Sequence, residues 1–267
     1  MKLTADSCSA ITGAGSGLGR ALALELAARR GRLVLGDVNV EGVEETARLC
    51  REAGASDARA LRCDVTRVAD VEALADACEG RVDLVVNNAG VSSGGRIGEI
   101  PLDDWRWTLE VDLFGVIHGC HVFTPRLRAQ GRGHILNVAS AAGLVSTPRM
   151  GAYNVAKAGV VALSETLAAE LAGSGVGVTV LCPTFIKTNI VASGRFADPG
   201  TRALGEKLVA RGVDAAGIAR RTLRSVERGQ LYCLPMADAR WAWRLKRLAP
   251  ASFVKLAAAG MKRMSGR

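Results

Sequence analysis

A tyrosine and a lysine stand four residues apart in the segment GAYNVAKAG, residues 151–159. On a helix, residues i and i+4 share a face, so the phenol of Tyr153 and the ammonium of Lys157 would point the same way. A nearby cation favours the phenolate and lowers the pKa of a tyrosine, which is otherwise about 10. Such a pair could take a proton from an alcohol or return one to a carbonyl. The alternative is a core tyrosine beside a solvated lysine.

A glycine-rich turn, TGAGSGLGR (residues 12–20), follows the first predicted strand. Its glycines permit a tight turn and a close approach of the backbone to a pyrophosphate. The helix that starts here offers free N–H groups and the positive end of its dipole. The residues expected to contact a dinucleotide are Gly13, Ser16, Gly17, Leu18 and Gly19.

Asp37 follows the second predicted strand, 18 residues after Gly19. A carboxylate here can accept hydrogen bonds from both hydroxyls of an adenosine ribose and would repel a 2′-phosphate. Position 38 is valine, and Ser16 stands where a phosphate-binding base would suit NADP. These residues favour NAD over NADP. The alternative for Asp37 is a helix cap, because the segment DVN precedes a predicted helix.

Polar residues also end two later predicted strands. NNAG, residues 87–90, suits a turn that holds backbone against a ligand, although an ordinary asparagine-rich turn would look the same. Ser140 follows another strand, thirteen residues before Tyr153. Because ligands bind beyond the carboxyl ends of parallel strands, we expect these groups to lie close together.

Short aliphatic runs alternate with segments of helical spacing along most of the chain. This alternation predicts an α/β fold, a doubly wound parallel sheet of about seven strands. Pro125 predicts a bend or stop near the end of the longest helical segment. The predicted strands are 9–12, 33–36, 58–63, 82–87, 134–139, 177–182 and 229–234, and the predicted helices are 19–30, 40–53, 68–79, 102–130 and 151–172.

Composition and charge restrict the kind of protein. The seven cysteines are scattered without a metal-binding spacing, which favours reduced, buried thiols and no metal site. No apolar run is long enough to span a membrane, and the first residues do not form a secretory signal, so we expect a cytoplasmic protein that is membrane-peripheral at most. Of the net charge of +9, eight positive charges fall in residues 240–267, which contain no acid. A nearly neutral body argues against nucleic-acid binding.

We therefore expect one domain, residues 1–239, with a basic helical appendage, residues 240–267. Trp241, Leu245 and Leu248 have helical i, i+4, i+7 spacing, and Pro250 separates them from a second apolar helix. Arg244 and Arg247 lie off this stripe. A basic amphipathic helix with tryptophans can lie in a membrane interface. The alternative is that the stripe packs on the body or on a partner subunit. The apolar residues of the second helix are Phe253, Val254, Leu256 and Ala257.

Together these motifs resemble the short-chain dehydrogenase/reductase family. TGAGSGLG, CDVT (63–66), NNAG, Ser140 and YNVAK (153–157) occur in the family's order and spacing over roughly residues 7–235. The resemblance implies a Rossmann-type domain that binds NAD(P), with Ser140, Tyr153 and Lys157 as catalytic groups, and a homodimer or homotetramer. The cofactor contacts that it implies are Asp64 and Val65 near the adenine, Asn88, Ala89 and Gly90 along the cofactor, Tyr153 and Lys157 at the nicotinamide end, and Thr188 at the carboxamide.

The chain departs from the family pattern at two positions. Asp112 stands where the family usually has an asparagine that holds a water relaying protons from the lysine. An acid can also hold a water, as an acceptor, and it would stabilise a charged lysine. Asp112 is thus a working variant of the relay, the interpretation that we favour, or the sign of a slower enzyme. Thr184 replaces a more usual glycine.

Residues 183–212 would form a flap over the substrate. Its aliphatic and aromatic residues predict an apolar alcohol or ketone as substrate, oxidised or reduced with NAD(H). Two alternatives stay open. A non-catalytic dinucleotide sensor is expected to have lost Tyr153 or Lys157, and an NAD-dependent lyase or epimerase usually has a larger substrate domain. The apolar candidates are Ile186, Ile190, Val191, Phe196, Leu204, Leu144 and Met150, and the nearby arginines that could clamp an acidic substrate are Arg96, Arg149 and Arg195.

Overall fold

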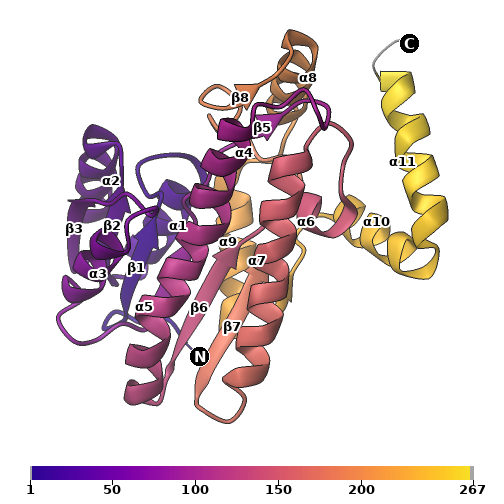
Figure 1. Cartoon of the computed structure of the whole chain (residues 1–267). Helices are drawn as coiled ribbons and strands as arrows, with labels where there is room; N and C mark the ends of the chain where they lie inside the picture. The colour runs from indigo at the N-terminus through magenta and orange to yellow at the C-terminus, as the bar shows by residue number, and fades with distance from the viewer. Residues whose placement is uncertain (1, 265–267) are drawn as a thin grey trace.

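The computed structural model describes residues 2–264, and for residues 261–264 the backbone only. Seven strands form one parallel sheet in the order β3-β2-β1-β4-β6-β7-β9 (Figure 1). The predicted doubly wound α/β fold is confirmed, and each of the seven predicted strands is present. The strands are β1 (Cys8–Thr12), β2 (Arg32–Asp37), β3 (Asp57–Arg62), β4 (Leu84–Asn87), β6 (Gly133–Val138), β7 (Val176–Leu181) and β9 (Tyr232–Cys233).

The strand order reverses between β1 and β4, which pair with each other although β2 and β3 lie between them in sequence. Such a switch point opens a crevice at the carboxyl ends of the strands, where ligands bind in this class of fold. Helices cover both faces of the sheet. One face carries α1 (Gly17–Ala27), α2 (Val40–Glu52) and α9 (Ala215–Glu227), and the other carries α3 (Val68–Asp76), α5 (Gly115–Gln130) and α7 (Gly151–Glu170).

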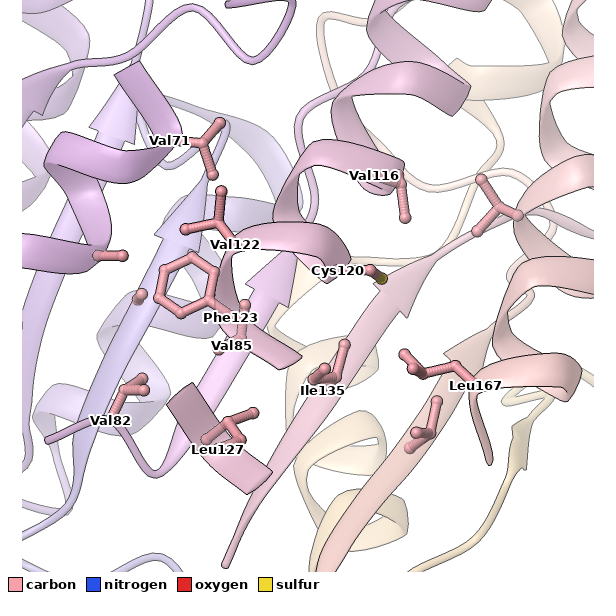
Figure 2. Close-up of a cluster of buried hydrophobic side chains, with 14 of the residues drawn as sticks. Val71, Val82, Val85, Val116, Cys120, Val122, Phe123, Leu127, Ile135 and Leu167 are labelled. Carbon is pink, nitrogen blue, oxygen red and sulfur yellow. The ribbon is translucent and has the colours of Figure 1, made fainter. Parts of the chain in front are cut away.

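A separate hydrophobic core lies on each face of the sheet. Successive strand residues alternate between them, so Leu33 and Leu35 join one core and Val34 joins the other. Figure 2 shows part of the core that contains Val34, where Phe123 lies beside Val85 and Leu127 lies toward Ile135. Because both faces are covered, the strands read as continuous apolar runs, which is why the sequence predicts them well. All seven cysteines are free and buried, as expected.

The long predicted helix, residues 102–130, has its irregularity in an unexpected place. It consists of α4 (Leu102–Leu109), a five-residue π turn, η1 (Glu110–Phe114), and α5. Pro125 does not stop the helix, since α5 continues to Gln130. Pro125 and His121, whose carbonyl loses its donor, are exposed, while Phe123 and Leu127 hold the other side of the helix in the core.

Smaller elements surround the carboxyl edge of the sheet. A short helix, α6 (Ala141–Val145), follows β6. In the segment predicted as the flap, β8 (Arg195–Phe196) pairs with β5 (Ser93–Gly94), and α8 (Pro199–Ala210) follows. These pieces frame the strand ends where the candidate residues gather.

The C-terminal appendage forms two helices that divide at Pro250, as predicted: α10 (Ala237–Leu248) and α11 (Pro250–Met264). Figure 1 shows α10 beside α6, and α11 standing away from the body. The side chains of Lys262 and Arg263, and all of Arg267, lie outside the described residues. In the described part of the chain, no helix has the length and apolar character needed to cross a membrane.

Candidate active site

Tyr153 and Lys157 lie in the first turns of α7, so the predicted i, i+4 relationship is present. The Lys157 Nζ atom is 5.6 Å from the centroid of the Tyr153 ring. Lys157 is only 3% exposed, whereas Tyr153 is half-buried. The alternative of a core tyrosine beside a solvated lysine is therefore wrong, because here the cation is the more deeply buried group.

Asp112 reaches this lysine from the π turn. Its Oδ2 atom lies 3.5 Å from Lys157 Nζ, and its Oδ1 atom accepts a hydrogen bond of 2.7 Å from the Val91 N–H. The ammonium also donates to the Val138 carbonyl at 3.2 Å. Gly90 lies against both charges, since a Cβ there would be 3.2 Å from Asp112 Oδ1 and 3.4 Å from Lys157 Nζ. The π turn thus places a buried carboxylate beside the catalytic candidates, as such turns often do at functional sites.

The acidity of Tyr153 differs from the expectation. Burial raises the pKa of its phenol, the carboxylate of Asp112 raises the pKa further, and a hydrogen bond with Ser140 lowers it. Burial is thus the largest influence on the pKa of Tyr153, and it acts against the lowering expected from Lys157. At neutral pH the phenol keeps its proton, which suits Tyr153 for donating one to a carbonyl oxygen.

Ser140 ends the strand segment before α6 and caps that helix. Its hydroxyl accepts a hydrogen bond of 3.1 Å from the Ala142 N–H and donates one of 3.4 Å to the Pro183 carbonyl. The Ser140 hydroxyl also influences Tyr153, since it lowers the pKa of the phenol. The structure therefore brings together Ser140, Tyr153, Lys157 and Asp112 from three segments: the start of α6, the start of α7 and η1.

The glycine turn packs directly on the NNAG turn. Gly13 has a positive φ of 64°, and a Cβ there would lie 2.7 Å from the Ala89 Cα atom. The Asn88 side chain donates to the carbonyls of Thr12 and Gly13, at 2.9 and 3.0 Å. The Thr12 hydroxyl accepts hydrogen bonds from the N–H groups of Asn88 and Ala89. Thr12 was not among the predicted site residues, although a threonine that ends the first strand was a visible signal.

The start of α1 is free to bind an anion. The Ser16 side chain is exposed and makes no capping hydrogen bond, so the first N–H groups of the helix lack partners within it. Gly17 lies against Thr188, whose Cγ2 would be 3.0 Å from a Cβ at that position. Leu18 buries its side chain in the core, so only its backbone can face a ligand. These features fit a pyrophosphate, which accepts backbone hydrogen bonds at a helix start.

Asp37 holds the glycine turn at the end of β2. Its carboxylate accepts hydrogen bonds from the N–H groups of Gly15 and Asn39, at 2.8 and 2.9 Å. The cap of α2 is Asn39, which accepts from the Gly42 N–H at 3.0 Å, so the helix-cap interpretation of Asp37 is wrong. Each Asp37 oxygen retains a lone pair, which fits the hydroxyls of a ribose.

Arg20 was not predicted as a site residue, and it secures the turn from the other side. Its guanidinium donates to the carbonyls of Gly15 and Gly42 and to the Thr46 hydroxyl. The Arg20 guanidinium is therefore engaged with the protein itself.

Asp64 and Val65 follow β3 at the same edge of the sheet. The segment after β3 is joined directly to the end of β2, because the Cys63 N–H donates to the Asp37 carbonyl at 2.9 Å. Val65 is buried, and its carbonyl accepts a hydrogen bond of 2.8 Å from His118 Nδ1. The Asp64 carboxylate accepts from the N–H and hydroxyl of Thr66. Val65 is thus part of the core beside Gly115, and its place near an adenine stays a prediction.

Comparison with known proteins agrees with this geometry. The family model described as short chain dehydrogenase matches residues 8–197. The chain belongs to the short-chain dehydrogenase/reductase family. The protein SadH of Mycobacterium tuberculosis, named as an oxidoreductase, is 36% identical over 259 residues, 94% of each chain. D-threitol dehydrogenase of Mycolicibacterium smegmatis is 37% identical over 209 residues, 71% of this chain and 80% of its own.

Solved structures of the family show the same fold. A short-chain dehydrogenase/reductase from Burkholderia phymatum, crystallised in complex with NAD, has a TM-score of 0.87 and 37% identity, over 92% of this chain and 95% of its own. An NAD⁺-bound xylitol dehydrogenase has a TM-score of 0.75 and 26% identity, over 88% of this chain and 99% of its own. This chain is therefore an oxidoreductase of the short-chain dehydrogenase/reductase family with a Rossmann-type fold.

The predicted flap of this short-chain dehydrogenase/reductase, residues 183–212, buries several of its apolar side chains in its own packing. Ile186 joins the core on one sheet face, and Val191 and Phe196 both lie against Gly205. Ile190 and Leu204 remain half-exposed. The apolar lining available to a substrate is therefore smaller than the sequence suggests.

The three arginines near the flap each have an acidic partner. Arg195 lies 3.1 Å from Asp104, and its guanidinium stacks 4.1 Å from the Trp107 ring centroid. Arg149 lies 3.7 Å from Asp198, and Arg96 lies 3.6 Å from Glu99. Paired in this way, none of the three offers an unneutralised charge to an acidic substrate.

Proposed function

We propose that this chain transfers a hydride between NAD(H) and an alcohol or carbonyl carbon of an apolar small molecule. The observation that carries the proposal is the grouping of Ser140, Tyr153 and Lys157 at the carboxyl edge of the sheet, next to the glycine turn. Bound NAD would accept the hydride in one direction and supply it in the other. The proton is moved by the chain's own residues.

Each part of the cofactor has fitting residues. Asp37 offers acceptors for the adenosine ribose, and the start of α1 offers N–H groups for the pyrophosphate. Val65 would lie near the adenine and Thr188 near the carboxamide. The NAD complex of the Burkholderia phymatum relative supports NAD. The carboxylate of Asp37 and the engaged guanidinium of Arg20 support NAD over NADP.

Proton transfer would pass through Tyr153. The hydroxyl of Ser140 hydrogen-bonds the substrate oxygen and fixes its position. Tyr153 donates its proton to that oxygen during reduction and accepts it during oxidation. Lys157 holds a positive charge near the phenol, and Asp112 fixes the ammonium in place. Because Asp112 also opposes the phenolate, it sets the pH at which the base form becomes available.

An absorbance screen for reduced nicotinamide tests the function. NAD is supplied with secondary alcohols of increasing chain length and ring count, and D-threitol and xylitol serve as polar comparisons. We expect oxidation that improves with apolar size and disappears in Tyr153→Phe. NAD binding without any turnover would favour a dinucleotide sensor. A changed substrate without net NADH would favour a lyase or epimerase.

We further propose that the chain forms a homodimer or homotetramer through α5 and α7 and acts in the cytoplasm. Apolar side chains are exposed on this side of the molecule, including Phe114 at 44% and Val155 at 51%. The seven free thiols fit a reducing compartment. Light scattering at micromolar protein concentration tests the assembly, and a monomer would contradict it.

A further inference from the structure

Helix α10 has apolar side chains on two opposite sides. The inner side packs on the body: Ala239 is 2% exposed, and the Trp243 ring lies 5.0 Å from that of Tyr232. The outer side carries Trp241, Leu245 and Leu248, which are 69%, 44% and 85% exposed. The interpretation that this stripe packs on its own body is therefore wrong for the chain as described. A helix with two apolar sides needs a second partner.

The flank between these two sides is basic. Arg240, Arg244 and Arg247 have i, i+4, i+7 spacing, and all three are exposed. Their guanidiniums do not meet a carboxylate in the described ion pairs: Arg240 donates to the Leu234 carbonyl, Arg244 lies 5.6 Å from the Trp241 ring centroid, and Arg247 lies 5.3 Å from that of Trp243. Asp238 is the last acid in the sequence. The outer stripe thus borders a row of uncompensated positive charge.

A cavity of about 360 Å³ opens on this basic flank, between α9, β9 and α10. Three arginines line it, Arg221, Arg240 and Arg244, and no acid does. Arg221 uses one N–H on the Pro235 carbonyl, which leaves other donors in its guanidinium. Guanidiniums in such a cluster suit phosphate oxygens.

Helix α11 continues the exposed apolar surface. Val254 and Leu256 are 63% and 60% exposed, and Lys255 is exposed between them. Figure 1 shows this helix directed away from the sheet and its covering helices.

We propose that the outer face of α10, with its arginine flank, binds the surface of a bilayer that contains anionic phospholipids. Tryptophan and leucine side chains then lie at headgroup depth, and the arginines meet phosphates. Charge complementarity selects this partner over a second copy of the chain. A two-fold contact between α10 helices would bring two rows of arginine together, whereas an anionic surface neutralises one row.

Lys246 connects α10 to the rim of the active site, the segment between Ser140 and Tyr153. Its ammonium donates to the Leu144 carbonyl at 2.7 Å and to the Ser146 hydroxyl at 3.3 Å. Both acceptors lie in the segment between Ser140 and Tyr153. A bilayer on α10 would therefore lie beside this rim, where a lipid-like alcohol could reach the active site. The delivery of such an alcohol rests on the proposed function, whereas the binding to the bilayer does not.

Co-sedimentation of the full chain with vesicles tests the binding. We expect sedimentation with phosphatidylcholine vesicles containing phosphatidylglycerol, decreasing as salt rises, and little with phosphatidylcholine alone. Because each arginine near an anionic surface contributes about one kcal/mol, Arg244→Gln with Arg247→Gln should lower partitioning roughly 30-fold. Trp241→Ala with Leu248→Ala should lower it as well. Substitution is preferable to truncation, because Trp243 is part of the core packing.

The matched control is Leu102→Ala with Arg106→Gln on α4, which removes an exposed leucine and an exposed arginine elsewhere. It should leave partitioning unchanged. Equal sedimentation of all variants, or none with anionic vesicles, would overturn the proposal. The proposal would also be overturned if the unaltered chain does not bind vesicles and the α10 variants dissociate an oligomer in light scattering. The outer face of α10 would then be a subunit interface.

Discussion

The carboxylate of Asp112 lies 3.5 Å from the ammonium of Lys157, and both side chains are almost completely buried. Burial raises the pKa of Asp112, and Lys157 and the Val91 N–H lower it. Removing two charges from water costs several kcal/mol per ion, which a single ion pair rarely repays in stability. The buried pair is therefore better explained by a function than by stability. Asp112 acts on Tyr153, because it raises the pKa of the phenol.

We expect Asp112→Asn to change the pH dependence of alcohol oxidation. Asp112 raises the pKa of Tyr153, so loss of its negative charge lowers the pKa of the phenol. Oxidation needs the deprotonated phenol, so the acidic limb of the rate profile should move to lower pH. The measurement is the rate against pH at saturating NAD. Asp103→Asn, an exposed acid on α4, is the control and should not move the profile. A shift to higher pH would contradict the role given to Asp112.

We expect Tyr153→Phe to lose at least about 10²–10⁴-fold in turnover, the share that general acid–base catalysis supplies. Only the hydroxyl changes, so the fold and NAD binding should be preserved. Circular dichroism and a fluorescence titration with NADH check both points. Near-normal turnover would remove Tyr153 from the mechanism.

We expect Asp37→Ala to weaken NAD binding about 10- to 100-fold, because it deletes a charged acceptor. It should also narrow the preference for NAD over NADP, since the repulsion of a 2′-phosphate is lost as well. Asp37→Asn separates the two effects: its amide oxygen can still accept from the Gly15 N–H, but the negative charge is absent. A titration in which the unaltered chain already prefers NADP would refute the assignment.

We expect Gly19→Ala to disrupt the glycine turn. The added methyl group would overlap the carbonyl oxygen of Gly13, so the start of α1 must move. Overpacking of this kind costs about 1–3 kcal/mol, and the displaced N–H groups should bind NAD poorly. Gly217→Ala in α9 is the control, because no atom lies near its Cβ position. It should be neutral or stabilising by up to about 1 kcal/mol. Thermal unfolding with and without NAD distinguishes the two variants.

Much of the fold follows from local pattern, but the site's electrostatics do not. The buried strands and the glycine turn appear in sequence because each depends on a few adjacent residues. The pKa of Tyr153 depends on how far Asp112 lies from the lysine and from the phenol. The sequence does not contain those distances. The engagement of Arg20 with Gly42 is likewise a tertiary contact.

The appendage shows the same limit. Spacing identifies the stripe of Trp241, Leu245 and Leu248, yet it does not tell which of two apolar sides of α10 meets the body. The structure decides this through Trp243, whose ring packs beside Tyr232. Pro125 is a comparable case, since its effect on the helix depends on whether the neighbouring residues are anchored.

The π turn at Glu110–Phe114 fixes how many residues this helix can have. On one side of the turn, the Thr108 hydroxyl meets Ser93 in the interior at 2.8 Å. On the other, Gly119 must face Asn87, because any Cβ there would overlap the amide. Deleting one residue between them would rotate the second half by roughly 100° and present a larger neighbour to Asn87. Substitutions on the solvent-facing side of this helix are therefore tolerable. A change in the number of residues between Thr108 and Gly119, even by one, is not.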